Sequence, residues 1–381
     1  MKRALRWPAI AAVTALTCGM TAGASQAAEK GAAAPAAGPG TCTSAPVVSR
    51  SLVSASGRSL SAASARQAAA TDLVYRVPQG GTIQVQEPPA GFSAATASKA
   101  ELSSLGLRSA AIRPLLRLIS APGMRYVPVG SLCQLTGLSY APPATANPND
   151  SVNWAGPVVS AKGAHRHFFE AAASFAEPHF VPGCPGKSDH AIWTGLGGYV
   201  GSRALLQDGT DTVVGGGGPN HAFAWLELIA THSANPPLEL NPKTFPVGVG
   251  NKMTVLAHYK NDKIVFDYVN STKKIYAQLT ITGAYGHHPS YFYDGASAEV
   301  INERGFTGKG FLKYREPVGK RVTFSAASFN NGQSAHADTR YLHVLTMTRD
   351  GAKGGPVLDR VGGLKSTLHS SSWHDQWYRC N

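Results

Sequence analysis

The strongest constraint on the fold is an alternation of apolar and polar residues with a period of two. It is clearest between residues 252 and 282, where Met253, Val255 and Ala257 alternate with polar neighbours before a polar turn at 260–263. Such a period places every second side chain on one face of a strand. The 41 Gly and 25 Pro have no Gly-X-Y period, and after residue 150 no helical pattern lasts much beyond two turns. The sequence therefore predicts an all-β chain, folded as a β-sandwich or jelly roll.

Residues 1–28 have the features of a secretory signal peptide. A basic start is followed by an apolar run from Trp7 to Met20 and by small residues up to Ala28. The run is shorter than the roughly 20 apolar residues of a membrane anchor. A lipoprotein signal at Cys18 is disfavoured, because Thr17, directly before it, is bulkier than the small residue that such a site prefers. We expect a secreted, extracellular protein whose mature form is not bound to a membrane.

Export places the cysteines in an oxidising compartment. Cleavage of the signal peptide would remove Cys18. The four remaining cysteines allow three pairings; they are Cys42, Cys133, Cys184 and Cys380. We favour Cys42–Cys133 and Cys184–Cys380, because each pair then stays within one compositional segment.

The rest of the chain divides near residue 150. Residues 29–150 are rich in Ala, Ser and Pro, with one amphipathic helical pattern at 98–119, broken at Pro114, and an extended linker at 141–148. We interpret this part as a pro-segment, with a separate binding module as the alternative. Residues 151–381 are predicted to form the β-sandwich catalytic domain.

Several functional classes are not supported. The formal net charge is +13, but the basic residues are scattered and no nucleic-acid-binding motif accompanies them. The common serine-hydrolase, zinc-protease and phosphate-loop motifs are missing. His165 with His167, and His287 with His288, have no third ligand at a suitable spacing. Gly215–Gly218 is best explained as a tight connection. We expect no metal and no cofactor.

The candidate functional residues lie in short motifs after residue 150. The first is Asn153-Trp154-Ala155-Gly156. Trp193-Thr194-Gly195-Leu196-Gly197-Gly198 follows, and then Leu205-Leu206-Gln207-Asp208-Gly209, which we expect to be a turn. Two strands come next: Phe223, Trp225 and Glu227 share one face, as do Glu299, Ile301 and Glu303. A carboxylate on an apolar strand face is costly unless it is solvated, paired or used.

In the order and the residues of these motifs, the chain resembles the glutamic peptidases, the eqolisin family, over roughly residues 151–335. The resemblance implies a concanavalin-like sandwich of two antiparallel sheets and endopeptidase activity at acid pH. By position it assigns the catalytic dyad to Gln207 and Glu299, and Glu303 is a rival to Glu299. Substrate-binding roles fall on Trp154, Trp193, Phe223, Trp225 and Glu227.

The dyad has a physical rationale. An ionised Glu299 can take a proton from the water that attacks the scissile carbonyl and return it to the leaving amine. The Gln207 amide does not titrate, and its N–H groups can stabilise the oxyanion. The partners would be protein or peptide substrates, and nothing demands more than a monomer.

At three positions the sequence departs from the family pattern. Gly197 occupies a position where many members have an aspartate, Val300 replaces the usual tryptophan, and Ile229 replaces an aromatic residue. We expect these departures to affect substrate preference more than the fold. Two alternatives remain open at this point. One is a noncatalytic sandwich that binds carbohydrate or cell-wall polymer, and the other is a relative that has lost activity.

Overall fold

The computed structural model describes most of the chain from Thr41 onward. The described ranges are 41–44, 47–52, 71–76, 82–107, 113–136, 149–161, 167–181, 186–199, 202, 204–215, 221–230, 233–234, 236–284, 287–307, 310–330, 342–366 and 371–380. The predicted signal peptide and the linker at 141–148 lie outside these ranges and stay predictions. In the described part, no helix is both long and apolar enough to span a membrane.

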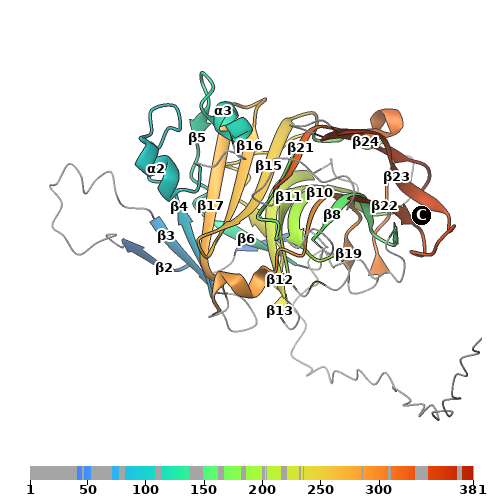
Figure 1. Ribbon diagram of the computed structural model, residues 1–381, viewed down its shortest axis with the longest axis horizontal. Coiled ribbons are helices and arrows are strands. Elements are labelled where there is room, and N and C mark those ends of the chain that lie inside the picture. Colours follow the sequence, from blue (N-terminus) through green and yellow to red (C-terminus); the bar gives the residue numbers. More distant parts are fainter. Residues whose placement is uncertain are drawn as a thin grey trace, which may run out of the picture. The chain divides into compact units, whose positions relative to one another are not determined.

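Two large sheets form the body of the molecule (Figure 1). The first, sheet A, has the strand order β1 (Thr41–Ser44), β6 (Leu132–Thr136), β14 (Leu238–Leu240), β12 (His221–Ala230), β11 (Ala204–Val214), β10 (Ser188–Gly197), β18 (Ser297–Glu303), β8 (Trp154–Ser160) and β22 (Leu342–Thr348). All of these neighbours pair antiparallel.

Sheet B has the order β2 (Val47–Leu52), β3 (Thr71–Arg76), β4 (Thr82–Glu87), β17 (Ile275–Ala284), β16 (Lys263–Asn270), β15 (Lys252–Lys260), β9 (Glu170–Ala176), β21 (Arg321–Asn330), β24 (Ser371–Trp377) and β23 (Val357–Ser366). The end of β22 pairs with β23, so this one strand links the two sheets. Two short strands pair parallel at the edges: β5 (Arg125–Tyr126) with β17, and β7 (Asp150–Ser151) with β22.

The main core lies between the two sheets. Leu206, Leu226 and Val300 of sheet A are buried in one cluster with Val255 and Phe266 of sheet B. The prediction of an all-β sandwich of antiparallel sheets is therefore confirmed.

The strand–turn–strand prediction for residues 252–282 is also confirmed. β15 and β16 form a hairpin whose turn residues, Asn261 and Asp262, both have positive φ angles. Asn and Asp tolerate this conformation better than most residues, which is why they suit such a turn.

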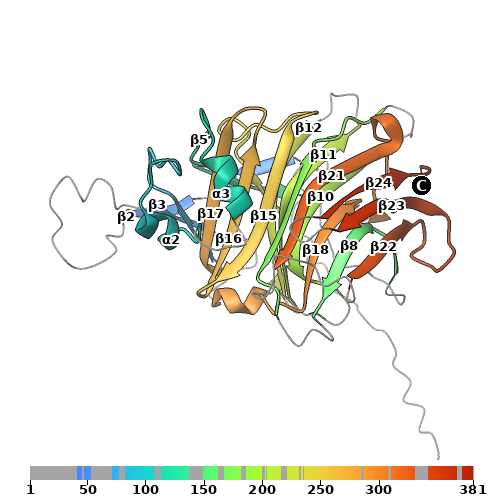
Figure 2. The ribbon, with the colours of Figure 1, turned by 45° about the horizontal axis from the view of Figure 1, so that its top comes forward.

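The strands of the 29–150 segment join both sheets. β6 lengthens sheet A beyond β14, and β4 lengthens sheet B beyond β17. Its two helices, α2 (Lys99–Ser104) and α3 (Arg113–Ile119), lie over the β15–β17 part of sheet B (Figure 2). Leu107 and Leu115 are buried there against Leu256 and Tyr276.

The helical pattern at 98–119 was misjudged at one point. Pro114 does not break a helix but lies in the first turn of α3, where its missing N–H leaves no hydrogen bond unmade. The interruption comes earlier, because Gly106, with a φ of +75°, follows the end of α2.

The C-terminal residues form part of sheet B. A buried network fixes β23 to sheet A: Asn302 Nδ2 donates to Tyr314 Oη and to Asp359, and the Tyr314 hydroxyl donates to Asp359. Cys133 and Cys380 are each disulfide-bonded. The side chains of Cys42 and Cys184 lie outside the described part of the chain, so the pairing stays a prediction.

Candidate active site

The ladder of sheet A brings Gln207 and Glu299 to the two sides of one residue. Gly195 in β10 lies directly opposite Gln207 in β11 and directly opposite Glu299 in β18. The Gln207 and Glu299 side chains therefore share one face, with Cα atoms about 10 Å apart, two interstrand spacings. Gly195 has no side chain to stand between them. We call this face of sheet A the site face.

Gln207 is held from the opposite side by Glu227. The two residues are paired across β11 and β12, and Gln207 Nε2 donates to Glu227 Oε2 at 2.7 Å. Both side chains are buried. One N–H of the amide is thus fixed by Glu227, and this sets the orientation of the amide plane.

Glu299 is a fully buried carboxyl group whose oxygens have no hydrogen-bond partner among the described residues. Burial raises its pKa well above the usual value; the Ser297 hydroxyl opposes the rise, and the nearby Asp294 carboxyl adds to it. In this closed state Glu299 is therefore neutral over a wider pH range than an exposed glutamate.

Glu303 has quite different surroundings. Its Oε1 accepts a hydrogen bond from Asn153 Nδ2 at 2.7 Å, and its Oε2 accepts one from Trp193 Nε1 at 2.8 Å. Trp193 in turn packs edge-on against Trp154, with ring centroids 4.8 Å apart. The Asn-Trp-Ala-Gly motif and the Trp193 motif are therefore joined through Glu303, a role that the sequence did not reveal.

Two glycines leave room for the Trp193 ring. A Cβ on Gly195 would lie 2.7 Å from Trp193 Cζ3, and one on Gly209 would lie 2.1 Å from the Ile192 carbonyl oxygen. The sequence interpretation of residues 205–209 as a turn is wrong. They lie in the middle of β11, and Gly209 is needed for close packing against β10.

The aromatic side chains proposed to bind substrate gather on the site face. Trp154, Trp193, Phe223 and Trp225 belong to one buried cluster. Leu135 of β6, in the 29–150 segment, belongs to the same cluster. None of the seven predicted site side chains is more than 1% exposed. Substrate cannot reach them in this closed state.

The departures from the family pattern have different consequences. Gly197 has a φ of +94°, and a Cβ there would lie 2.1 Å from the Ala204 carbonyl oxygen, so this backbone admits no aspartate. Val300 is buried in the core between the sheets, so its side chain does not lie on the site face. Ile229 does lie at the edge of the aromatic cluster on the site face.

A second acidic pair lies further along the site face. Burial raises the pKa of Asp189 well above the usual value, and the neighbouring Asp211 carboxyl adds to the rise. The sequence analysis missed this pair. In the described part of the chain, no group of three or more His, Cys, Asp or Glu side chains could hold a metal ion.

Comparison with known proteins gives the family. Residues 152–354 match the model of the peptidase A4 family. A comparison with curated proteins gives no match. The chain is similar to the structure of scytalido-glutamic peptidase with a transition state analog inhibitor, with 16% identity, a TM-score of 0.44, and coverage of 60% of this chain and 98% of that one. It is also similar to aspergilloglutamic peptidase from Aspergillus niger, with 19% identity, a TM-score of 0.39, and coverage of 50% and 99%.

The family model spans more than half of the chain and contains every motif discussed above. The chain belongs to the peptidase A4 family, the eqolisins. It is a peptide-bond hydrolase of the glutamic type.

Proposed function

We propose that the protein is a secreted endopeptidase in which Gln207 and Glu299 form the catalytic dyad, active at acid pH. The observation that carries this proposal is the placement of both residues opposite Gly195 on one face. An amide and a carboxyl group so placed can hold one water molecule above Gly195. Family membership favours this function over a noncatalytic binding sandwich.

Each member of the dyad has a separate task. Glu299 takes a proton from the water as it attacks the scissile carbonyl carbon, and later gives that proton to the leaving amine. Gln207 donates its second amide N–H to the oxyanion that forms on the carbonyl oxygen. Because Glu227 holds the first N–H, the amide needs no reorientation during the reaction.

The aromatic cluster is proposed to bind apolar side chains of the substrate. Phe223 and Trp225 lie on the same strand face as Glu227, beside the amide. Trp193 and Trp154 form the floor next to Gly195, and Glu303 keeps the Trp193 ring in place.

We propose that residues 29–150 are a pro-segment that keeps the enzyme closed. Supporting this, β6 extends the sheet that carries the site, and Leu135 is buried with the site aromatics. Release of the segment would expose Glu299 to water and lower its pKa toward the ordinary value. An ionised base would then be present in acid, where the buried carboxyl stays protonated.

The dyad can be tested with controls matched for burial. A denatured protein substrate is incubated with the enzyme between pH 2 and 8, with and without residues 28–150. Gln207→Ala should lower kcat on the order of 10²-fold, as for other oxyanion donors, and Glu299→Gln roughly 10³-fold, within the range for a general base.

The controls lie on sheet B. Gln278 is also buried and donates to a carboxylate, Asp267, at 2.8 Å, so Gln278→Ala repeats the Gln207 change away from the site. Glu170 is a buried glutamate with a raised pKa, so Glu170→Gln repeats the Glu299 change. Equal losses in the site and control variants, or cleavage by Glu299→Gln at the wild-type rate, would refute the dyad.

A further inference from the structure

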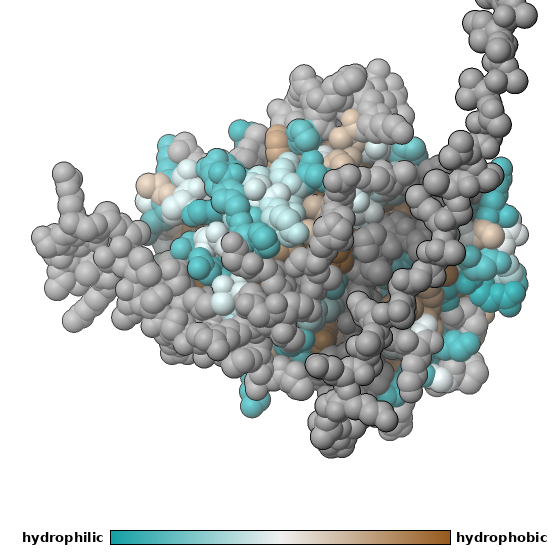
Figure 3. Space-filling view, turned by 90° about the horizontal axis from the view of Figure 1, so that it is seen from below, coloured by the Kyte–Doolittle hydropathy of each residue, from teal (hydrophilic) through white to brown (hydrophobic). Residues whose placement is uncertain are grey.

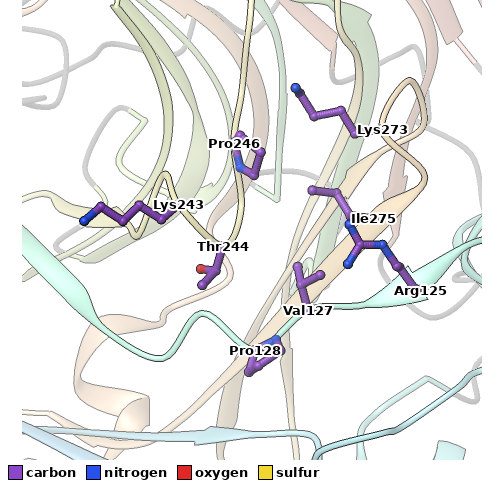
Figure 4. Close-up of a pocket in the computed structure, with 8 residues that line it drawn as sticks. All are labelled: Arg125, Val127, Pro128, Lys243, Thr244, Pro246, Lys273 and Ile275. Carbon is purple, nitrogen blue, oxygen red and sulfur yellow. The ribbon is translucent and has the colours of Figure 1, made fainter.

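A pocket of about 510 Å³ is lined by none of the predicted site residues. Three segments meet there: Arg125, Val127 and Pro128 come from the 29–150 segment, Lys243, Thr244 and Pro246 follow β14, and Lys273 and Ile275 lead into β17. Figure 4 shows the Arg125 guanidinium beside Ile275 and the Lys273 side chain on the other side of Ile275. The Lys243 side chain points away from these two.

The lining of this pocket has three cations and no anion. Arg125, Lys243 and Lys273 are exposed. The only two ion pairs found among the described residues both involve histidine, so none of the three is paired with a carboxylate there. Glu87, in β4 of the 29–150 segment, is buried, and its Oε1 accepts a hydrogen bond from the backbone N–H of Val129.

Backbone hydrogen bonds hold these cations near one another. Arg125 pairs with Ile275 in register, and its N–H donates to the Lys274 carbonyl. The Lys273 N–H donates to Asn270 Oδ1. Like charges fixed around one concavity repel each other, and the repulsion acts between the 29–150 segment and the sandwich. An anion in the pocket would remove it.

The apolar residues of the lining would contact the uncharged part of the ligand. Val127 and Ile275 form a buried aliphatic floor, and Pro128 and Pro246 flank it. The Arg125 and Lys273 charges suit an anion with more than one negative charge. A guanidinium fork with lysine ammonium groups suits the tetrahedral oxygens of phosphate.

We propose that this pocket binds a phosphate-type anion, and that the bound anion ties the 29–150 segment to the sandwich. Arg125 holds it from the segment, and Lys273 holds it from the sandwich. On the face seen in Figure 3, the described residues at the surface are mostly hydrophilic, and apolar ones show as small separate areas. The effect on maturation rests on the proposed pro-segment, whereas the binding does not.

Binding is tested by calorimetry at pH 7 and constant ionic strength, on full-length chain shown by mass spectrometry to be uncleaved. The probes are inorganic phosphate, glycerol 3-phosphate and tripolyphosphate. Arg125→Gln and Lys273→Gln should each weaken binding at least tenfold. Lys353→Gln, at an exposed lysine outside the pocket, should stay within twofold of wild type. Equal affinities in all variants would overturn the proposal. So would a binding signal that appears only when the added probe raises the ionic strength and is absent when the ionic strength is held constant.

The probes also separate two sources of phosphate. Tighter binding of glycerol 3-phosphate than of inorganic phosphate supports the site as one for phosphate esters of a polymer or lipid. The reverse order supports a site for free phosphate or polyphosphate. Absence of binding by all three overturns the site.

The bridging role has its own measurement. Amide hydrogen exchange in peptides covering 113–136 should slow when tripolyphosphate is added to wild type, and should not respond in Arg125→Gln. If the ligand binds in calorimetry but leaves this exchange unchanged, the anion does not hold the segment. Neither readout depends on peptide cleavage, so failure here leaves the proposed dyad untouched.

Discussion

Glu299 and Glu303 lie on the same face of β18, yet their surroundings differ in one decisive respect. Both are fully buried, and burial raises the pKa of both. Glu303 accepts hydrogen bonds on both oxygens from Asn153 and Trp193, whereas the Glu299 oxygens have no hydrogen-bond partner among the described residues. Buried polar groups are normally satisfied, so one left without partners in a folded chain calls for a functional explanation.

The comparison separates two uses of a buried carboxyl group. Glu303 organises its neighbours, because it accepts hydrogen bonds from Asn153, which directly precedes β8, and from Trp193 in β10. Glu299 leaves its oxygens available for a water molecule and a substrate. The same residue type thus holds the fold at one end of the site face and is proposed to carry out proton transfer at the other.

The largest expected effect contrasts these two glutamates directly. In the enzyme freed of residues 28–150, Glu299→Gln should lower kcat roughly 10³-fold and leave the unfolding free energy at pH 4 nearly unchanged. Glu303→Gln should lower the unfolding free energy by about 1–3 kcal/mol, because an amide nitrogen replaces one of the two oxygens that accept hydrogen bonds and leaves a buried donor unpaired. Single-turnover cleavage and urea unfolding of each variant measure both effects. The opposite pattern would make Glu303 the base.

The space over Gly195 provides the next test. Gly195→Ala brings a methyl group against the Trp193 ring, 2.7 Å from Cζ3, in the gap between Gln207 and Glu299. We expect kcat to fall on the order of 10²-fold, because displacement of reacting groups by about 1 Å has that cost. Gly283→Ala is a matched control on sheet B, since its nearest contact is at 3.4 Å. Full activity of Gly195→Ala would show that the water does not lie above this residue.

A third test uses the pH dependence of stability away from the site. Burial raises the pKa of Glu170 to about 8, with the Asp267 carboxyl adding to the rise. A carboxyl group whose folded pKa is raised stabilises the protein fully below its unfolded pKa, and that contribution is lost as the pH rises toward the folded pKa.

Glu170→Gln should therefore match wild type at pH 4 and be more stable than wild type by about 1–3 kcal/mol at pH 8. Urea unfolding at pH 4, 6 and 8 measures this. Burial lowers the pKa of His258 to about 3, so this residue destabilises the folded protein as the pH falls below 6.5. Because His258 is present in both proteins, the quantity to follow is the unfolding free energy of Glu170→Gln minus that of wild type. A difference that shrinks with rising pH would contradict the assignment.

The smallest effect concerns the hydrogen bond between Trp193 and Glu303. Trp193→Phe removes the Nε1 donor and leaves an aromatic ring, so the unfolding free energy should fall by about 1–3 kcal/mol. The KM for a denatured protein substrate should change by no more than a few-fold. A large rise in kcat or KM with unchanged stability would mean that Glu303 acts on the substrate rather than on the fold.

Strand alternation predicted the faces of the site well. Phe223, Trp225 and Glu227 share a face, and so do Glu299 and Glu303, because side-chain direction in a strand depends only on residue parity. The β15–β16 hairpin followed for the same reason.

Other features depend on which strands become neighbours, and local pattern does not give this. Gly209 resembled a turn residue, but its role is to admit the backbone of β10. The pairing of β4 and β6 with the two sheets involves partners far away in the chain. Contacts of this kind are determined by tertiary packing, which outweighs local propensity.

The single glycine between Gln207 and Glu299 has a consequence for how such an enzyme can diversify. The separation of the two reactive groups is determined by the backbone ladder of three adjacent strands, with no loop involved. Loops around the rim can lengthen, shorten or change composition without altering that separation. Substrate preference and bond-breaking chemistry are therefore inherited through different parts of the chain, and new specificities can arise while the reactive geometry stays the same.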